Sequence, residues 1–293
     1  MTEPLVSILI PSYKASHFEQ ALRSALGQTY LNIEILVSDN CPTEEIRDIC
    51  RKFPQVIYQR NPEKGNANIL SSLFSGKGQY LKPLFDDDLM HPFCIERMVK
   101  AMSLHPDIEL VFSASQVIDS DNMRLQQRRP FTQSGMLAGA TLYRMLAMGP
   151  ANVVGEQSSI LFKRSRLWEI GAADIFKMAG HDFGYGLADV AFYCNLSRDS
   201  QSYYIDEELT YFRRDPRHAS NSNPAANANY GLCISDGIDL ALAAHKEHAM
   251  STEDLLACRP AIESLAAEAG HLYPQLPPAY NRFLSYLGAL GQV

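Results

Sequence analysis

The sequence predicts an α/β fold in which helices flank a mostly parallel sheet, followed by a helical region at the C-terminal end. Three observations favour it. Short apolar, β-branched runs alternate with segments whose apolar residues recur at helical spacing, as in successive strand–helix units. Of the 293 residues, 46% are hydrophobic and 20% charged, which is typical of a globular protein. Polar loops follow several of the predicted strands, where open α/β sheets bind their ligands.

The predicted elements follow one another in a regular order over the first 113 residues. We expect strands at 5–10, 33–37, 56–58, a run ending at Phe85, and 108–113. We expect helices capped by Ser16 and Thr43, one over 69–76, and one opened by Pro92. Pro11 and Pro54 are predicted to end the first strand and the second helix.

The rhythm breaks down over residues 124–152, and we interpret the stretch 126–135 within it as a mobile or acceptor-facing loop. After Pro224, Ala- and Leu-rich stretches predict helices over 234–244, 252–258 and 262–269. We therefore expect two domains, a catalytic domain over 1–223 and a helical subdomain over 224–293.

The overall charge and the cysteines exclude several protein classes. A formal charge of −7 argues against a nucleic-acid partner, which needs many Lys and Arg side chains to match phosphates. The six cysteines are far apart and form no C-x-x-C pair, which favours reduced thiols. No stretch predicts a signal peptide or a transmembrane segment. We expect a cytoplasmic protein, a location compatible with peripheral binding to the inner face of the membrane.

The run Asp86-Asp87-Asp88 follows a predicted strand and precedes the helix that begins near Pro92. Three adjacent carboxylates repel one another unless a cation joins them. Hard carboxylate oxygens suit Mg²⁺ or Mn²⁺, and a diphosphate can complete the coordination. The alternative is a solvated loop that caps a helix, but the position at the end of a strand favours a metal site.

Two further loops contain candidate binding residues. Asp39 ends the second strand, where its carboxylate can accept a hydrogen bond from a base or a ribose, although such an Asp is more often a turn residue. In the loop 61–68, Gly65 permits close backbone approach and Lys64 supplies positive charge. Neither loop is specific by itself.

Taken in order, these strings resemble family 2 glycosyltransferases, which have the Rossmann-like GT-A fold. The first block is VSILIPSYKASHFEQALRSALGQTYLNIEILVSDN, and the second is NPEKGNANILSSLFSGKGQYLKPLFDDDLMHP. The resemblance is continuous over residues 1–115. It implies that the loops named above bind a nucleotide sugar, with the roles given next.

The resemblance assigns donor contacts to Pro11, Ser12, Tyr13, Asp39, Lys64, Asn66, Asp86 and Asp87. Among these, Asp39 would contact the base and Asp86 the ribose. Asp87 or Asp88 would bind the metal, because three Asp in a row leave the register open. Asn40 stands where many members of the family carry a second Asp, which weakens the inference that the base is uracil.

The later part of the chain resembles the family at two more places. Gly186-Leu187-Ala188-Asp189 is similar to the third acidic motif, which makes Asp189 the predicted catalytic base and leaves Asp182 as the competitor. The stretch from Tyr204 to Arg214, followed by His218, is similar to a motif whose His joins the metal and the diphosphate.

The resemblance implies an inverting, Mn²⁺- or Mg²⁺-dependent transfer of a sugar from a nucleoside diphosphate sugar, with a UDP-sugar as the expected donor. The acceptor would be a hydroxyl of a glycan, a lipid-linked glycan or a protein, in surface polysaccharide or glycoconjugate synthesis. Two alternatives stay open, a nucleotidyltransferase and a non-catalytic nucleotide- or carbohydrate-binding module. The first normally has a Gly-rich, basic loop after its first strand, and PSYKAS is not such a loop.

Overall fold

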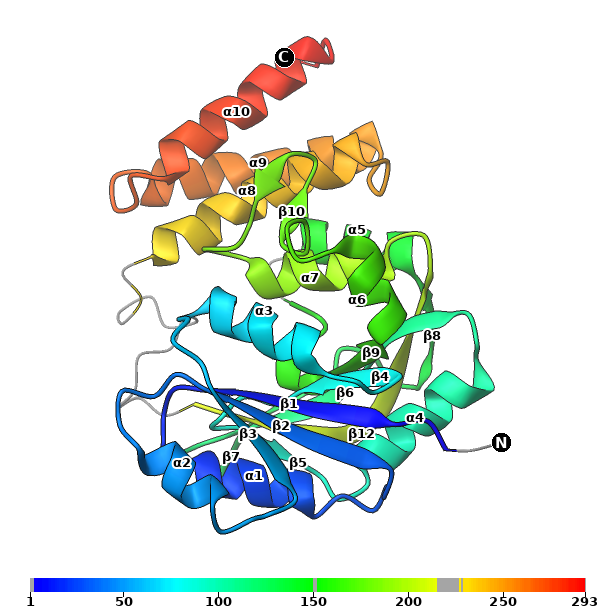
Figure 1. The fold of residues 1–293 in the computed structure, drawn as a ribbon. Helices are drawn as coiled ribbons and strands as arrows, with labels where there is room; N and C mark the ends of the chain where they lie inside the picture. The colour runs from blue at the N-terminus through cyan, green and yellow to red at the C-terminus, as the bar shows by residue number, and fades with distance from the viewer. Residues whose placement is uncertain (1–2, 150–151, 215–226, 228, 293) are drawn as a thin grey trace. The chain divides into compact units, whose positions relative to one another are not determined.

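The computed structural model describes residues 3–149, 152–214, 227 and 229–292 (Figure 1). The chain forms two compact units. The first consists of Met1–Leu137, Val154–Ala172 and Ser200–Asp215, and the second of Ala138–Val153, Ala173–Asp199 and Pro216–Val293. The predicted domain boundary between residues 223 and 224 lies outside the described residues, so it stays a prediction.

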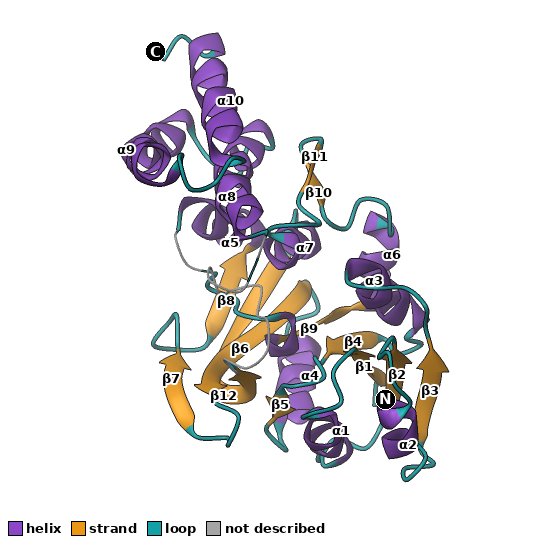
Figure 2. Cartoon of the chain, turned by 90° about the vertical axis from the view of Figure 1, so that its left-hand side faces the viewer, coloured by secondary structure: helices purple, strands orange, loops and turns teal. Residues whose placement is uncertain are grey.

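The first unit is built on a ten-stranded sheet with the order β3-β2-β1-β4-β9-β6-β12-β5 (Figure 2). Neighbouring strands pair in parallel from β3 to β4 and between β6 and β12, whereas β9 is antiparallel to both of its neighbours. The other two of the ten strands lie off this path, since β7 pairs with β6 and β8 with β12. The strands are β1 (Val6–Ser12), β2 (Ile33–Asp39), β3 (Val56–Arg60), β4 (Tyr80–Pro83), β5 (Leu89–Met90), β6 (Ile108–Ile118), β7 (Arg124–Arg128), β8 (Gly135–Ala138), β9 (Ile160–Lys163) and β12 (Gln201–Arg213).

Helices of the first unit cover both faces of this sheet. Ile8 and Ile10 of β1 belong to one apolar cluster with side chains of α1, α2 and α4, whereas α3 packs against β1 and β2 from the other face, where the Asn68 amide bonds to Ser38. The helices are α1 (Phe18–Leu26), α2 (Glu45–Cys50), α3 (Asn66–Ser75), α4 (Cys94–Leu104), α6 (Arg164–Ile170) and the short 3₁₀ helix η1 (Gln157–Ser159). The α/β prediction is therefore confirmed.

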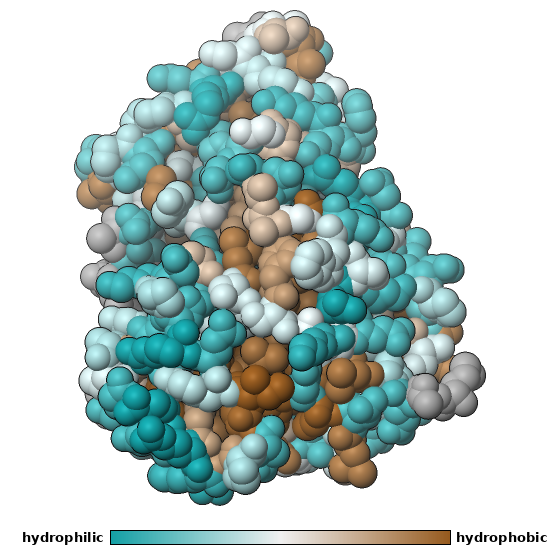
Figure 3. All heavy atoms as spheres, viewed as in Figure 1, coloured by the Kyte–Doolittle hydropathy of each residue, from teal (hydrophilic) through white to brown (hydrophobic). Residues whose placement is uncertain are grey.

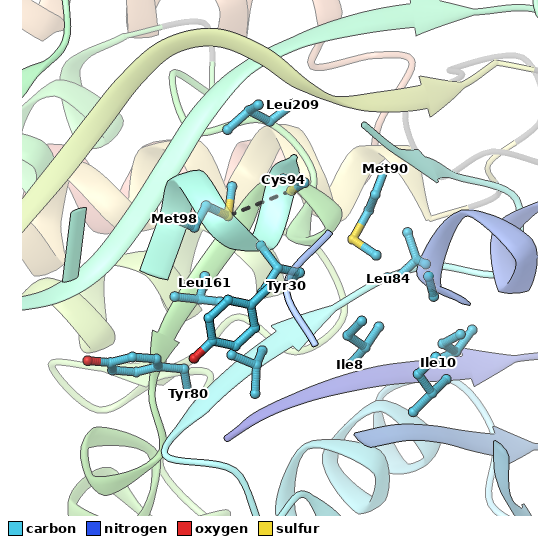
Figure 4. Close-up of a cluster of buried hydrophobic side chains, with 14 of the residues drawn as sticks. Ile8, Ile10, Tyr30, Tyr80, Leu84, Met90, Cys94, Met98, Leu161 and Leu209 are labelled. Carbon is cyan, nitrogen blue, oxygen red and sulfur yellow. Dashed lines mark hydrogen bonds between the residues drawn. The ribbon is translucent and has the colours of Figure 1, made fainter. Parts of the chain in front are cut away.

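Apolar side chains hold the helices on the first of these faces (Figure 4). Ile8, Leu84 and Cys94 are fully buried there, and the thiol of Cys94 lies 3.9 Å from the sulfur of Met98, one helical turn away. Burying side chains of this size removes about 1.5–3 kcal/mol of unfavourable hydration each. This cluster fixes the strands whose ends form the site described below.

The second unit is mainly helical. Its helices are α5 (Gly139–Met148), α7 (Ala188–Ser197), α8 (Tyr230–Lys246), α9 (Thr252–Ala269) and α10 (Leu276–Ala289), and a small hairpin joins β10 (Lys177–Met178) to β11 (His181–Asp182). Ile238, Leu255 and Phe283 belong to a core that α8, α9 and α10 share. Ser251 begins α9 through a capping box with Asp254. The C-terminal helices expected from the sequence are confirmed.

Several sequence-based element boundaries were wrong. Pro11 lies inside β1 rather than ending it, and α1 begins at Phe18 with His17, not Ser16, at the N-cap. The stretch 124–152, expected to be irregular, contains β7, β8 and α5. The exposed β7 sequence RLQQR lacks an apolar alternation, which explains why its strand was missed. Helix α9 continues through Pro260 instead of dividing there.

On the face seen in Figure 3, hydrophilic side chains surround apolar patches near the centre of the view. Within the described residues, no helix combines the length and the apolar character needed to cross a lipid bilayer. Individual large apolar side chains are exposed, among them Tyr13 and Tyr185 at 56% and 80%. Singly exposed side chains of this kind are common on proteins.

Candidate functional site

Three neighbouring parallel strands of the first unit end beside one another. Ser12, at the end of β1, lies opposite Asp39, at the end of β2. On the other side β1 pairs with β4, after which the chain turns through Asp86–Asp88. Carboxyl ends of parallel strands meet at one edge of a sheet, where α/β proteins bind ligands. The structure thus brings these predicted site residues to a single edge.

Asp86 joins the acidic turn to the segment after β1. Its Oδ2 accepts the backbone N–H groups of Tyr13 and Lys14, each at 2.6 Å. Burial, reinforced by the neighbouring carboxylate of Asp87, raises the pKa of Asp86 to about 6. Asp86 therefore fixes the backbone at Tyr13, a residue that is 56% exposed.

Asp88 is the most deeply buried carboxylate of the run, at 1% exposure. The hydroxyl of Ser158 donates to its Oδ2, and the backbone N–H of Arg213 donates to Oδ1 at 3.0 Å. Burial and then the charge of Asp87 hold the pKa of Asp88 well above its usual range.

Asp87 differs from both neighbours because its side chain reaches solvent, with 21% exposed. The Lys14 ammonium lies 3.4 Å from its Oδ2. Protein groups thus hold the carboxylates of Asp86 and Asp88. The carboxylate of Asp87 is accessible to a ligand and lies beside the Lys14 ammonium.

Two basic residues near the turn make contacts that were not predicted from the sequence. The guanidinium of Arg213 donates to the carbonyl of Asp87 at 2.8 Å and to that of Asp119 at 2.6 Å. Lys82 is fully buried, and its ammonium donates to the carbonyls of Ser158 and Pro83. Burial lowers the pKa of Lys82. Arg213 lies in the stretch 204–214 that resembles the family, but no local pattern predicts these contacts, because each residue acts on groups that only the folded sheet brings near.

Asp39 is completely buried, and protein groups occupy both of its carboxylate oxygens. Oδ1 accepts the backbone N–H of Cys41 at 2.8 Å, which is the turn role weighed in the sequence analysis. Oδ2 accepts from the Tyr58 hydroxyl at 2.7 Å and from the Arg60 guanidinium at 2.8 Å. Burial, and next the bond to Asp39, raises the pKa of Tyr58 to about 12. The base contact expected of Asp39 stays a prediction.

The loop 61–68 continues the same edge. Gly65 adopts a φ of 55°, in the left-handed region that favours glycine, and Asn66 then begins α3. The amide of Asn68 binds Ser38, with the Ser38 hydroxyl donating to its Oδ1 at 2.6 Å. This buried polar contact fixes the start of α3 against the end of β2. Lys64 is exposed in the same loop.

In the second unit, Asp189 lies in the first turn of α7. The Asn152 amide donates to its Oδ2 at 3.0 Å. Its competitor, Asp182, is exposed at the end of β11 and accepts the backbone N–H of Gly184 at 2.9 Å. His218 lies outside the described residues, so its predicted contact with metal and diphosphate stays a prediction.

Within the described residues, one His/Asp/Asp group brings three possible ligand atoms within 4.8 Å of one another, namely those of His181, Asp236 and Asp239. Arg282 donates to both oxygens of Asp239, at 2.9 and 2.6 Å, and His181 lies 3.0 Å from Asp236. The bond to Asp236 raises the pKa of His181. Arg282 already pairs with Asp239, and His181 already bonds to Asp236, so this group fits a protein hydrogen-bond and ion-pair network better than a metal site.

A comparison with known protein families assigns this chain to one of them. The model of the family described as "Glycosyl transferase family 2" matches residues 7–171, more than half of the chain. The chain belongs to this family. The matched range contains the ends of β1 and β2, the acidic turn and Ser158, and the family expected from the sequence is thereby confirmed.

Related sequences agree with this assignment. An uncharacterised glycosyltransferase of Rickettsia prowazekii is 33% identical over 132 residues, which are 43% of this chain and 41% of that relative. A chondroitin synthase of Pasteurella multocida is 27% identical over 124 residues, or 40% of this chain and 13% of the relative. The chain thus matches less than half the length of these relatives.

Among solved structures, residues 1–349 of S. aureus TarS in complex with UDP-GlcNAc match with a TM-score of 0.64 and 12% identity, over 95% of this chain and 80% of that one. At this identity the likeness concerns the fold alone. It agrees with the GT-A fold expected from the sequence.

Proposed function

We propose that this glycosyltransferase moves a sugar from a nucleoside diphosphate sugar, with UDP as the nucleotide, to a hydroxyl of a glycan, lipid-linked or protein acceptor. The single observation that carries the proposal is the edge where β1, β2 and β4 end, with Asp87 as the one accessible carboxylate of the acidic turn. Relatives named chondroitin and hyaluronan synthase and a structural neighbour bound to UDP-GlcNAc support this donor class.

The donor would lie along this edge. Pro11 and Ser12 end β1 and Tyr13 follows it, and these residues would border the nucleotide. Asp39 at the end of β2 and Asn66 at the start of α3 would lie beside them. Tyr13, which is 56% exposed, is available for packing against a base or ribose. Lys14 and Lys64 supply positive charge for the diphosphate.

A divalent cation, Mn²⁺ or Mg²⁺, fits the acidic turn. The donor set consists of hard carboxylate oxygens, and the buried neighbours Asp86 and Asp88 leave Asp87 as the residue best placed to hold the ion, with His218 as a further candidate ligand. When bound, the cation neutralises charge on the leaving diphosphate. Lys14, 3.4 Å from Asp87, would add to this stabilisation from the protein itself.

We assign the general base to Asp189. An acceptor hydroxyl is a weak nucleophile, so a carboxylate must take its proton while the glycosidic bond forms. The Asn152 amide, 3.0 Å from Oδ2, would hold the Asp189 side chain in one orientation. Inversion at the anomeric carbon follows from a single displacement of this kind. We further propose a cytoplasmic location, compatible with work on surface polysaccharide or glycoconjugate precursors.

The donor assignment can be tested by thermal denaturation with UDP or UDP-GlcNAc, with and without Mn²⁺. A ligand that binds only the folded chain stabilises it by RT ln(1 + [L]/Kd), or about 2.7 kcal/mol at a hundredfold excess over Kd. We expect stabilisation by UDP that chelation removes and that Asp87→Ala abolishes. Absence of any shift with uridine nucleotides in the presence of Mn²⁺, alongside a shift with another nucleotide, would contradict the UDP assignment.

A further inference from the structure

The two residues that hydrogen-bond to the Asp88 carboxylate come from distant parts of the sequence. Ser158 lies in η1, and Arg213 ends β12, 70 and 125 positions away from Asp88 respectively. Ser158 and Arg213 are 2% and 3% exposed. Each oxygen of the Asp88 carboxylate accepts from one of them. Asp88 therefore has both oxygens committed inside the protein.

Ser158 fixes more than the carboxylate. Its Oγ also accepts the backbone N–H of Phe85 at 3.0 Å, at the start of the acidic turn. Its carbonyl accepts from the buried ammonium of Lys82. One hydroxyl thus contacts the turn at both ends, before Asp86 and at Asp88, while the lysine holds the serine backbone in place.

Arg213 holds the middle of the turn. Its Nε donates to the carbonyl of Asp87 at 2.8 Å, while its backbone N–H binds Asp88. The rest of its guanidinium bonds to the Asp119 carbonyl and to the Asn122 side chain. Held at these points, Arg213 fixes the backbone carbonyl of Asp87, and with it the backbone from which the Asp87 side chain extends.

We infer that Ser158 and Arg213 are positioning residues, which hold Asp88 and the backbone of the turn so that the carboxylate of Asp87 alone faces the ligand. This inference rests on the proposed function, since it concerns the same acidic turn. Asp88 would be an internal anchor, whereas Asp87, whose side chain is 21% exposed, would bind the cation. Ser158 has no substrate contact in this role.

The test uses the full-length chain and Mn²⁺ alone, with the free ion followed by electron paramagnetic resonance. We expect Ser158→Ala to weaken Mn²⁺ binding by about 10- to 100-fold, the usual effect of losing a group that orients a metal ligand. Ser159→Ala is the matched control. Ser159 is equally buried at 2%, lies in the same η1, and donates to the carbonyls of Val154 and Glu156 instead of to a carboxylate.

A double-mutant cycle separates positioning from loss of folding. If Ser158 acts through Asp88, its replacement by Ala should cost Mn²⁺ affinity in the wild-type background and little in an Asp88→Asn background. Ser158→Thr, which keeps the hydroxyl, should restore binding, and thermal denaturation confirms that each variant is folded. Equal Mn²⁺ affinity of Ser158→Ala and wild type, or an equal loss in both backgrounds, would overturn the inference. A wild-type chain that binds neither Mn²⁺ nor UDP would instead overturn the proposed function.

Discussion

Asp189 differs from the carboxylates of the acidic turn in the part of the reaction that it would serve. The acidic turn would bind the donor, whereas Asp189 would accept a proton. In Asp189→Asn the side chain keeps its size and an oxygen that can accept from the Asn152 amide. The substitution therefore removes the basic oxygen with little effect on the packing of α7.

We expect Asp189→Asn to lower turnover by about 100-fold or more, the scale of general-base catalysis, and to leave UDP binding unchanged. The assay is release of UDP from UDP-GlcNAc with water as the acceptor, with calorimetry for binding. Asp182→Asn is the control, since its carboxylate accepts the Gly184 N–H at the exposed end of β11. Normal turnover in Asp189→Asn together with lost turnover in Asp182→Asn would move the base to Asp182.

At the scale of elements, the approach of the chain to β4 depends on Gly78. Its N–H donates to the Ser7 hydroxyl at 2.7 Å, and a Cβ there would lie 2.6 Å from the Ser7 nitrogen and 2.7 Å from the Leu5 carbonyl oxygen. Both of these atoms are backbone, so β1 itself would have to move. Since β1 and β4 carry two sides of the site, this contact also aligns Tyr13 with Asp86.

We expect Gly78→Ala to reduce the free energy of unfolding by about 1–3 kcal/mol, as overpacking generally does. Urea denaturation measures it, with Gly135→Ala as the control, because a Cβ at Gly135 would meet no atom within 4 Å. The control should change stability by less than about 0.5 kcal/mol. Equal stability of the two variants would show that β1 and β4 can separate without cost.

The strands that end at the site were predictable because their signals are local. Buried parallel strands have continuous apolar runs, such as LVSILI. The polar residues that directly follow these runs lie at one edge of the sheet, regardless of the conformation of the loops. Ser158 was not predictable in the same way. Its contact with Asp88 exists only because β9 inserts antiparallel between β4 and β6, and no local pattern encodes that pairing.

The exposed elements were also difficult to predict. β7 and β8 extend the sheet beyond its buried strands, and their residues are mostly exposed or half-buried. Without a buried face, a strand has no apolar alternation to reveal it. For Asp39, the position could be predicted but the contacts could not. Its place at the end of β2 was predicted from the sequence, whereas its bonds to Tyr58 and Arg60 depend on the pairing of β2 with β3.

At the scale of the whole molecule, the cysteines report on the packing of each unit. Cys94 belongs to the core of the first unit and Cys194 to α7 of the second, and both are fully buried. Burial raises the pKa of Cys94 to about 11 and that of Cys194 well above its usual range. Because the thiolate is the reactive form, both should resist thiol reagents until the chain opens.

We therefore expect Cys94 and Cys194 to stay unlabelled by a thiol reagent at pH 8 in the native protein, and all six cysteines to react in denaturant. Mass spectrometry identifies the labelled positions. At a denaturant concentration where labelling of these two cysteines becomes measurable, adding UDP with Mn²⁺ should slow it equally at both if the two units open together, because the ligand stabilises the folded chain as a whole. Slower labelling of Cys94 alone would mean that the first unit binds the nucleotide and opens independently. Fast labelling of either cysteine without denaturant would contradict the packing on which the site depends.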